Sequence, residues 1–457
     1  MERLFYCNSE HGVIDLAIEG DVPESQNIFT VIVGKNGVGK SRLLSEIAKA
    51  CTHDYTDFSD SLRHRTSDST PKLIAVSTSP FDKFPSNRRS TSTHDVNTNY
   101  RYVGMRGEGP FGISSAVSLL SSAAKGWLEK LASLDNTANL LDVFNSLNFE
   151  PYAEFVFKPG YIGKPSVGQE QRDFFGNDIL REIDGLFLMH DISLDERYFN
   201  QLSNYNELQR NDIYDAMIEV HRFEVSRKAV TLAVDFTSGE FYAGSHYASG
   251  GLAKAILVLL SAGLMRLMDV RLTKKNYGAM SLKRASSGEQ CLLVIMLGIA
   301  GHITDNSIIL IDEPEISLHP RWQEEFIIML TSTFSSYRGC QFLIATHSPQ
   351  IISRLNAEGC YITSLSDHRI YKASYFSNRS ADYQLAELFD APGIMNEYIA
   401  RLAFSLLSKV KAAKRVTSEN SRELKQLQHL AENVDQNDPT KELVASVVQV
   451  CEIYADN

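Results

Sequence analysis

Residues 34–41 read Gly-Lys-Asn-Gly-Val-Gly-Lys-Ser, a glycine-rich run that ends in a lysine and a hydroxyl side chain. Glycines can take positive φ and let the backbone approach a phosphate closely. The Lys40 side chain can reach β- and γ-phosphates, and the Ser41 hydroxyl can ligate Mg²⁺. The run therefore predicts a nucleoside triphosphate site for ATP, with contacts from Gly34, Lys35, Asn36, Gly37, Val38, Gly39, Lys40, Ser41 and Arg42.

The segments on either side of this run have the patterns of a strand and a helix. Residues 28–33 are apolar and β-branched, as in a buried strand. After the run, Leu43, Leu44, Ile47 and Ala48 fall on one helical face. A helix N-terminus carries about half a positive charge and favours a bound phosphate. An ordinary strand-to-helix turn is the alternative, and the strand and helix on either side make it the weaker one.

Two later apolar segments read as strands, and each ends in side chains that can act on the same phosphates. Asp312 follows the first segment and matches a Walker B carboxylate that holds Mg²⁺. Glu313 beside it can activate the attacking water, and His347 ends the second segment. We predict Glu313, His347 and Lys40 as catalytic residues, and Ser41 and Asp312 as metal ligands. A simple Asp-Glu-Pro turn and a structural histidine are the alternatives.

A fifth motif, Ala-Ser-Ser-Gly-Glu-Gln at residues 285–290, precedes an apolar helical stretch. It resembles the signature motif of ABC-type ATPases, with Ser287 and Gly288 in the two phosphate-contacting places and Glu289 beside them. Helix N-capping is the alternative function of such a Ser-Ser-Gly run. The order Walker A, signature, Walker B, D-loop and switch histidine is the ABC order.

Within the ABC class, three segments are similar to the branch that contains SMC, recombination and OLD proteins. They are residues 286–290, 311–320 and 345–350. The resemblance covers about residues 1–110 and 225–375. It implies ATP sandwiched between two heads in a head-to-tail homo-oligomer, so that Lys40 and Ser41 of one chain face Ser287 and Gly288 of another.

Alternating strands and helices predict an α/β fold, and the resemblance makes it an ABC-type P-loop NTPase head. We expect a mixed, mostly parallel sheet with helices on both sides, a helical insertion and a helical C-terminal region. The expected divisions are an N-terminal core with the P-loop, a mostly helical insertion, a C-terminal core and a helical partner or oligomerisation region, at residues 1–110, 111–225, 226–378 and 379–457.

The overall length, the insertion without a long coiled coil, and Ser-Thr-Ser-Pro-Phe-Asp at residues 77–82 are similar to the PtuA family. These proteins are the ATPase subunits of Septu anti-phage systems. The resemblance implies a separate HNH nuclease partner of the PtuB kind and action on DNA through the complex. We expect no nuclease site in this chain, because the residues after the last core strand hold no acidic cluster and no His-Asn-His set.

One feature of the ABC pattern is missing. ABC ATPases carry a glutamine in a loop after an early strand, and this sequence has none between Gln26 and Gln169. Ser79 or Asp82 could stand in for it. The missing glutamine predicts a slow rate of ATP hydrolysis rather than weak ATP binding.

Composition excludes several other classes of protein. The chain has 457 residues, 43% of them hydrophobic, and a net charge of −11, which argues against a general polyanion binder. Its six cysteines are scattered without a Cys-x-x-Cys pair, as in a reducing cytoplasm. The chain opens without a signal peptide, and the apolar stretch 255–268, which reads as a buried helix, is too short to span a bilayer. We expect a cytoplasmic protein that does not act at a membrane.

Two other functions stay open. A DNA-repair or recombination ATPase would bind DNA through basic loops near residues 83–106 and 271–284. In the first of these segments arginines are interleaved with tyrosines, and a solvated loop is the alternative there. An ATP-sensing scaffold would bind nucleotide with little hydrolysis. The C-terminal region carries two apolar helical stripes, which we expect to pack in the chain's own core or to hold a partner: Ile399, Leu402, Ala403, Leu406, Leu407 and Val410, then Leu443, Val444, Val447, Val448 and Cys451.

Overall fold

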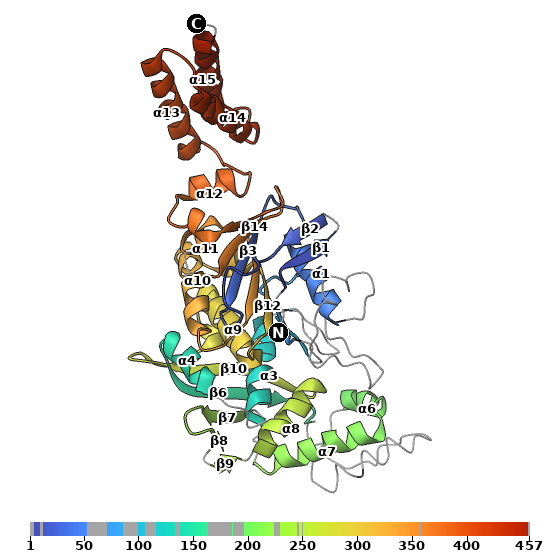
Figure 1. The fold of residues 1–457 in the computed structure, drawn as a ribbon. Coiled ribbons are helices and arrows are strands. Elements are labelled where there is room, and N and C mark those ends of the chain that lie inside the picture. The colour runs from blue at the N-terminus through green and yellow to red at the C-terminus, as the bar shows by residue number, and fades with distance from the viewer. Residues whose placement is uncertain are drawn as a thin grey trace. The chain divides into compact units, whose positions relative to one another are not determined.

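The computed structural model describes residues 4–9, 12–52, 71–85, 99–105, 116–132, 138–162, 185, 196–223, 229–244, 246–248, 250–355 and 358–455 (Figure 1). The chain divides into two compact units, and each unit combines segments that are distant in sequence. The first unit consists of Met1–Leu73, Asp305–Ile328 and Arg338–Asn457. The second consists of Ile74–Thr304 and Met329–Tyr337.

A mostly parallel sheet forms the centre of the first unit, with its strands in the order β15-β14-β3-β13-β12. The P-loop strand β3 pairs in parallel with β13 and β14, β12 pairs in parallel with β13, and β15 is antiparallel to β14. A small antiparallel hairpin joins β1 and β2. The strand bounds are β1 (Tyr6–Ser9), β2 (Gly12–Asp15), β3 (Ile28–Val33), β12 (Ile308–Asp312), β13 (Gln341–Ala345), β14 (Cys360–Ser364) and β15 (Arg369–Lys372).

Every residue of β3, β12, β13 and β14 is buried. Strands buried on both faces read as continuous apolar runs, which is why the sequence reveals them. The mixed, mostly parallel sheet with the P-loop strand inside it, together with the helical C-terminal region, confirms the predicted α/β fold class.

The first unit also contains the P-loop helix, short helices after the strands and a C-terminal bundle. The helices are α1 (Lys40–Thr52), η2 (Pro314–Ser317), α10 (Pro320–Thr333, whose last turns belong to the second unit), α11 (Pro349–Ser353), η3 (Ala373–Tyr375), α12 (Ala381–Glu387), α13 (Glu397–Ala413), α14 (Ser418–Glu432) and α15 (Pro439–Ala455).

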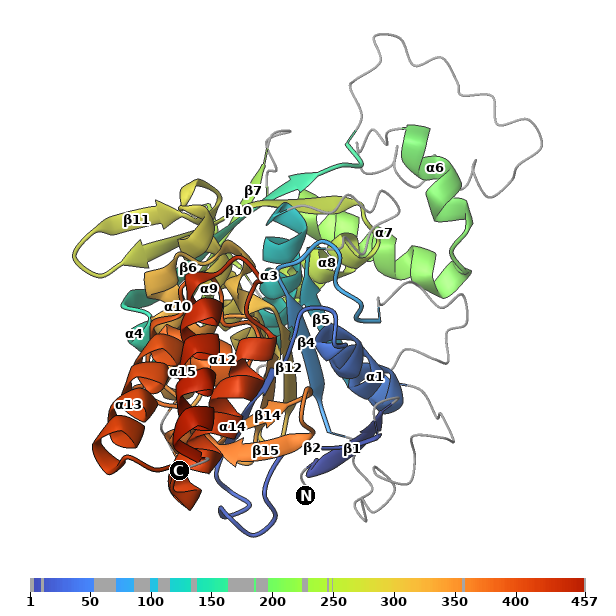
Figure 2. The ribbon, with the colours of Figure 1, turned by 90° about the horizontal axis from the view of Figure 1, so that it is seen from above.

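The last three helices pack side by side around a core of their own (Figures 1 and 2). Ile399, Leu406, Val410 and Val447 are fully buried in it. The two apolar stripes of the C-terminal region therefore pack against each other, as the first of the two alternatives predicted.

The second unit is built on a six-stranded antiparallel sheet in the order β11-β10-β6-β7-β8-β9, in which β10 and β11 form a long hairpin (Figure 2). The strands of this sheet are β6 (Phe149–Pro159), β7 (Val230–Asp235), β8 (Glu240–Ala243), β9 (His246–Ala248), β10 (Met265–Lys274) and β11 (Gly278–Ser281). Two further strands of the unit, β4 (Leu73–Ser77, whose first residue belongs to the first unit) and β5 (Tyr100–Gly104), lie outside this sheet. The helices are α3 (Ala116–Ala132), α4 (Ala138–Ser146), α6 (Glu196–Ser203), α7 (Glu207–His221), α8 (Gly250–Ser261), η1 (Leu282–Arg284) and α9 (Ser287–His302).

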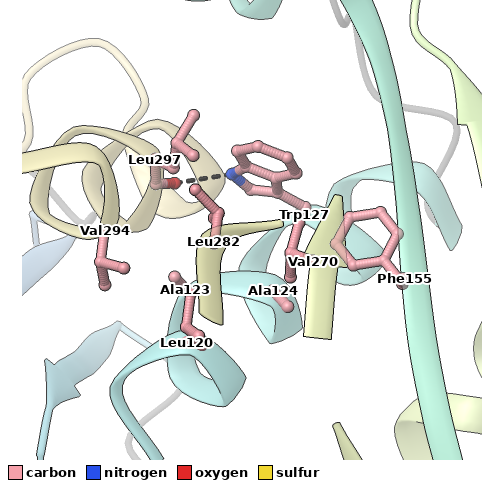
Figure 3. A pocket seen from close by; sticks show the side chains of 9 residues that line it. All are labelled: Leu120, Ala123, Ala124, Trp127, Phe155, Val270, Leu282, Val294 and Leu297. Carbon is pink, nitrogen blue, oxygen red and sulfur yellow. Dashed lines mark hydrogen bonds between the residues drawn. The ribbon is translucent and has the colours of Figure 1, made fainter. Parts of the chain in front are cut away.

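Trp127 on α3 is the centre of an aromatic cluster in this unit. Its indole lies 5.4 to 5.8 Å from the rings of Phe144, Phe155 and Phe236. Its Nε1 donates a hydrogen bond to the carbonyl of Leu297 on α9 at 2.6 Å (Figure 3). The small cavity beside it has an entirely apolar lining and so offers no polar group to orient a ligand.

Three local predictions need correction. β6 lies inside the span expected to be mostly helical, β5 lies in a stretch expected to be a loop, and β10 begins where a buried helix was expected to reach residue 268. β6 alternates buried and exposed residues along most of its length, and Pro151 near its start obscures that pattern in the sequence. β7 and β8 form an antiparallel hairpin. Within the insertion that is expected to be mostly helical, residues 178–188 lie outside the described residues except for residue 185.

Candidate nucleotide site

The loop between β3 and α1 has a backbone that only glycine adopts readily. Gly34 has φ 147°, Gly37 φ 80° and Gly39 φ 105°. A Cβ on Gly34 would lie 3.0 Å from Val38 Cγ1, whereas a Cβ on Gly37 would meet nothing within 4 Å. The loop is thus tight at its start and open at Gly37, where a phosphate needs close access to the backbone. This geometry fits a bound triphosphate.

The Lys40 ammonium lies inside this loop. Its side chain is buried, and its Nζ donates to the carbonyls of Gly34 at 2.7 Å and Lys35 at 3.1 Å. Burial lowers the pKa of Lys40 to about 8, although the carboxylates of Glu313, Glu315 and Asp312 act in the opposite direction. When a nucleotide binds, the Lys40 ammonium could replace its hydrogen bonds to these two carbonyls with contacts to phosphate oxygens.

The carboxylates come from the end of β12. Asp312 is the last residue of that strand and is 2% exposed. Glu313 follows in a left-handed conformation, φ 47° and ψ 56°, and its N–H donates to the carbonyl of Ala345 at 2.9 Å. A non-glycine residue in that region costs about 1–3 kcal/mol and persists where its surroundings hold it there. Such strain at a predicted catalytic residue is typical of a functional site.

Glu313 and His347 are in direct contact, with Oε1 and Nε2 3.3 Å apart. The pKa of His347 is lowered, first by burial and then by the charge of Lys40, against the opposing effect of Glu313. The imidazole is therefore neutral at pH 7, and we assign the contact as a hydrogen bond from Nε2–H to the carboxylate. The structure thus brings Lys40, Asp312, Glu313 and His347 together in one unit.

The loops that carry Glu313 and His347 are also joined by other side chains. The His347 N–H donates to Glu315 Oε1 at 2.5 Å. The Ser348 hydroxyl donates to Gln323 Oε1 at 2.6 Å, and Gln323 Nε2 donates to the carbonyl of Leu318 at 2.9 Å. Sequence reasoning missed Glu315, Gln323 and Ser348, although a second carboxylate in the Asp-Glu-Pro-Glu segment was a visible signal.

Ser41 and Arg42 lie in the first turn of α1. The Ser41 hydroxyl and the Asp312 carboxylate are hard oxygen donors of the kind that Mg²⁺ prefers, so this donor set fits the metal. On the other side of the loop, Lys35 Nζ donates to Asn433 Oδ1, at the end of α14, at 3.0 Å. No local sequence pattern predicts this last contact, because it joins residues 398 positions apart.

The signature residues belong to the second unit. Ser287, Gly288 and Glu289 form the first turn of α9, with Ser287 exposed and Gly288 buried. The Ser286 side chain caps this helix by accepting the N–H of Glu289 at 3.4 Å. The capping alternative is thus observed at Ser286, and it leaves Ser287 at the exposed helix N-terminus, where anions bind favourably.

The candidate replacement for the missing glutamine has a local role. Asp82 accepts hydrogen bonds from the N–H of Phe84 at 3.1 Å and the hydroxyl of Tyr102 at 2.6 Å. Ser79 Oγ accepts from the N–H of Phe81 at 3.2 Å. Both side chains are therefore engaged by their own loop, and Asp82 also by Tyr102 on β5.

Two basic residues of the hairpin predicted as a DNA contact are paired with carboxylates. Arg271 lies 3.4 Å from Glu154, and Lys274 lies 3.2 Å from Glu289. Arg101, in the other basic segment, lies 3.3 Å from Glu129. These pairs reduce the positive potential available to a phosphate backbone. The remaining arginines of that segment, at positions 88, 89 and 106, lie outside the described residues.

A family model described as "AAA domain, putative AbiEii toxin, Type IV TA system" matches residues 241–353, which is less than half of the chain. The matched span contains the signature motif, Asp312, Glu313 and His347. This chain is therefore similar to AAA-type ATPase domains over the second half of its predicted site.

Two curated relatives are also similar to this chain. One is the "Retron Vc95 probable ATPase" of Vibrio cholerae serotype O1 biovar El Tor, 31% identical over 153 residues, or 30% of this chain and 29% of the relative. The other is the "Retron Ec83 probable ATPase" of Escherichia coli, 22% identical over 383 residues, or 73% of this chain and 66% of the relative. The chain thus spans less than two thirds of each relative's length.

A solved structure, "Crystal structure of the SmcHead bound to the C-winged helix domain of ScpA", matches at 10% identity. It covers 33% of this chain and 69% of that chain with a TM-score of 0.18, so the likeness carries no argument. Among the described residues, no helix is both long and apolar enough to cross a membrane.

Proposed function

We propose that the protein is an ABC-type ATPase that binds ATP with Mg²⁺ and hydrolyses it to ADP and phosphate. The observation that carries this proposal is the contact between Glu313 and His347 in the same unit as the buried Lys40. The similarity to an AAA domain and to two proteins described as probable ATPases supports it.

Each side chain has a chemical task in this proposal. Lys40 would leave the loop carbonyls and bind the β- and γ-phosphates, while Ser41 and Asp312 would hold Mg²⁺, which would neutralise charge on the phosphates. The Glu313 carboxylate accepts a proton from the attacking water. His347 is neutral, so its Nε2–H can turn from Glu313 to a γ-phosphate oxygen. Because only ATP has a γ-phosphate, this contact would distinguish ATP from ADP.

The second half of the site comes from another copy of the chain. Ser287 and Gly288 at the N-terminus of α9 would meet the γ-phosphate held by the partner's P-loop, as the ABC resemblance implies. ATP then favours the assembled state because only that state makes these contacts. Hydrolysis removes the γ-phosphate and releases the pair.

We further propose the complex in which this ATPase acts. The resemblance to the PtuA family supports an ATPase subunit of an anti-phage complex whose assembly controls an HNH nuclease of the PtuB kind. DNA would be bound through that complex, since Arg271 and Lys274 of the described basic hairpin are paired with carboxylates. The C-terminal bundle has a core of its own, so it could present its outer faces to such a partner.

ATP turnover by purified variants tests the activity. Glu313→Gln is expected to bind ATP normally and to lose about 100-fold in turnover. Lys40→Ala is expected to lose ATP binding, because a lysine that contacts the phosphates is removed. Glu325→Gln, on an exposed position of α10, is the matched control and should behave as wild type. Unchanged turnover in Glu313→Gln would contradict the proposal.

A scaffold that senses ATP with little hydrolysis is the second candidate. The missing glutamine favours it, because both Ser79 and Asp82 already have hydrogen-bond partners, in their own loop and, for Asp82, on β5. The ratio of turnover to bound ATP separates the two functions. An ATP-dependent change in assembly without measurable phosphate release would favour the scaffold.

A further inference from the structure

Glu315 has a buried carboxylate at the junction of the two catalytic loops. It lies in η2, directly after the strained Glu313, and its Oε2 is closed off from solvent. Its Oε1 accepts the backbone N–H of His347 at 2.5 Å. Burial of a carboxylate destabilises the folded protein unless hydrogen bonds compensate for the lost hydration. The contact joins the end of β12 to the loop after β13.

A second link joins the same loops one residue further on. The Ser348 hydroxyl donates to Gln323 Oε1 at 2.6 Å, and Gln323 Nε2 lies 3.4 Å from the carbonyl of Glu315. Two consecutive residues, His347 and Ser348, are therefore fixed to the segment that carries Glu313. With its backbone held, the imidazole has few ways to change its distance from the Glu313 carboxylate.

We propose that Glu315 is a positioning residue for ATP hydrolysis, holding the His347 backbone so that the imidazole stays in register with Glu313 and the γ-phosphate. The inference rests on the proposed function. Glu315 needs no contact with nucleotide in this role. Displacement of a catalytic group by about 1 Å can cost 10²-fold in rate, so a single backbone hydrogen bond can have a large effect.

Burial raises the pKa of Glu315, while the N–H of His347 and other hydrogen bonds lower it. Oε1 can accept an N–H whether the carboxyl group is charged or neutral. Glutamine has nearly the same size and keeps an acceptor oxygen. Glu315→Gln should therefore preserve the positioning role, and Glu315→Ala should remove it.

The first test is a double-mutant cycle between Glu315 and His347, measured as kcat and KM for ATP. Glu315→Ala is expected to lower kcat about 10- to 100-fold with the nucleotide Kd changed less than about twofold. Glu315→Gln should stay within about threefold of wild type. In the His347→Ala background, Glu315→Ala should cause no further loss. Equal losses in both backgrounds would overturn the inference, as would a loss in Glu315→Gln equal to that in Glu315→Ala.

The second test needs no activity. Hydrogen exchange of nucleotide-free protein should quicken at the amides of residues 346–348 in Glu315→Ala and return to the wild-type rate in Glu315→Gln. Glu325→Ala is the control, since its exposed side chain contacts Arg321 on the same helix. Unchanged exchange in Glu315→Ala would overturn the inference. Failure of the proposed function is separate, because it appears as absent ATP turnover in the wild-type protein.

Discussion

ATP affinity is expected to fall as pH rises above about 8, because Lys40 loses its proton in the free protein. Burial lowers the pKa of this lysine from 10.5 to about 8. In the complex the phosphates favour the charged ammonium. Binding at high pH must therefore restore a proton to the lysine, whereas below pH 8 the proton is already in place.

The size of the effect follows from that pKa. If Lys40 stays protonated in the complex, affinity should weaken roughly eightfold between pH 7.5 and pH 9. Proton uptake should rise from about 0.2 per nucleotide at pH 7.5 to about 0.9 at pH 9. This window lies above the titration of a terminal phosphate, at about pH 6.

Isothermal titration calorimetry in two buffers of different ionisation enthalpy measures both the affinity and the protons taken up. Lys40→Arg stays charged throughout the window, so its affinity should show no such slope. Lys49→Gln, on an exposed position of the same helix, should keep the wild-type slope. A flat wild-type affinity with no proton uptake would refute the account of Lys40.

Two predictions concern stability, and urea unfolding measures both. Gly301→Ala places a Cβ 2.6 Å from Trp127 Cδ1 and should destabilise the protein by about 1–3 kcal/mol. Gly250→Ala places its Cβ in open space and should not destabilise it. Equal unfolding midpoints for the two variants would contradict this prediction. Leu406→Ala, fully buried in the C-terminal bundle, should cost about 2–5 kcal/mol, whereas Phe404→Ala, at 56% exposure, should cost less than about 0.5 kcal/mol; a neutral Leu406→Ala would mean that the bundle adds no stability.

The core of the first unit could be predicted from the sequence because its elements are encoded by residues close together in the chain. Gly34, Gly37 and Gly39 sit where φ must be positive, and β12 and β13 are unbroken apolar runs. β12 ends at Asp312, and His347 follows the end of β13 by two residues. Parallel pairing then places Asp312 beside Ala345, two residues before His347, which is why the two strand ends meet.

Other features depend on contacts between distant parts of the chain. The hydrogen bond from His347 to Glu315 and the one from Lys35 to Asn433 join residues 32 and 398 positions apart. No local pattern encodes either contact. β5 was missed for a related reason, since Tyr100 and Tyr102 are buried by long-range packing inside a stretch that is otherwise polar.

The central claim is that the P-loop is half of a site that a second copy of the chain completes. Mixing two inactive variants tests it most directly. Lys40→Ala lacks a working P-loop but keeps the signature motif, and Ser287→Arg has the opposite defect. Each variant alone should be inactive, and each should first be shown to have the wild-type unfolding midpoint.

In an equimolar mixture, half of the pairs should combine both variants, and each mixed pair holds one intact site. The account predicts that ATP turnover, measured as phosphate release, recovers to about a quarter of the wild-type rate. Recovery should require both variants and should depend on protein concentration. A mixture as inactive as its parts, or a Ser287→Arg variant that is fully active alone, would contradict the claim.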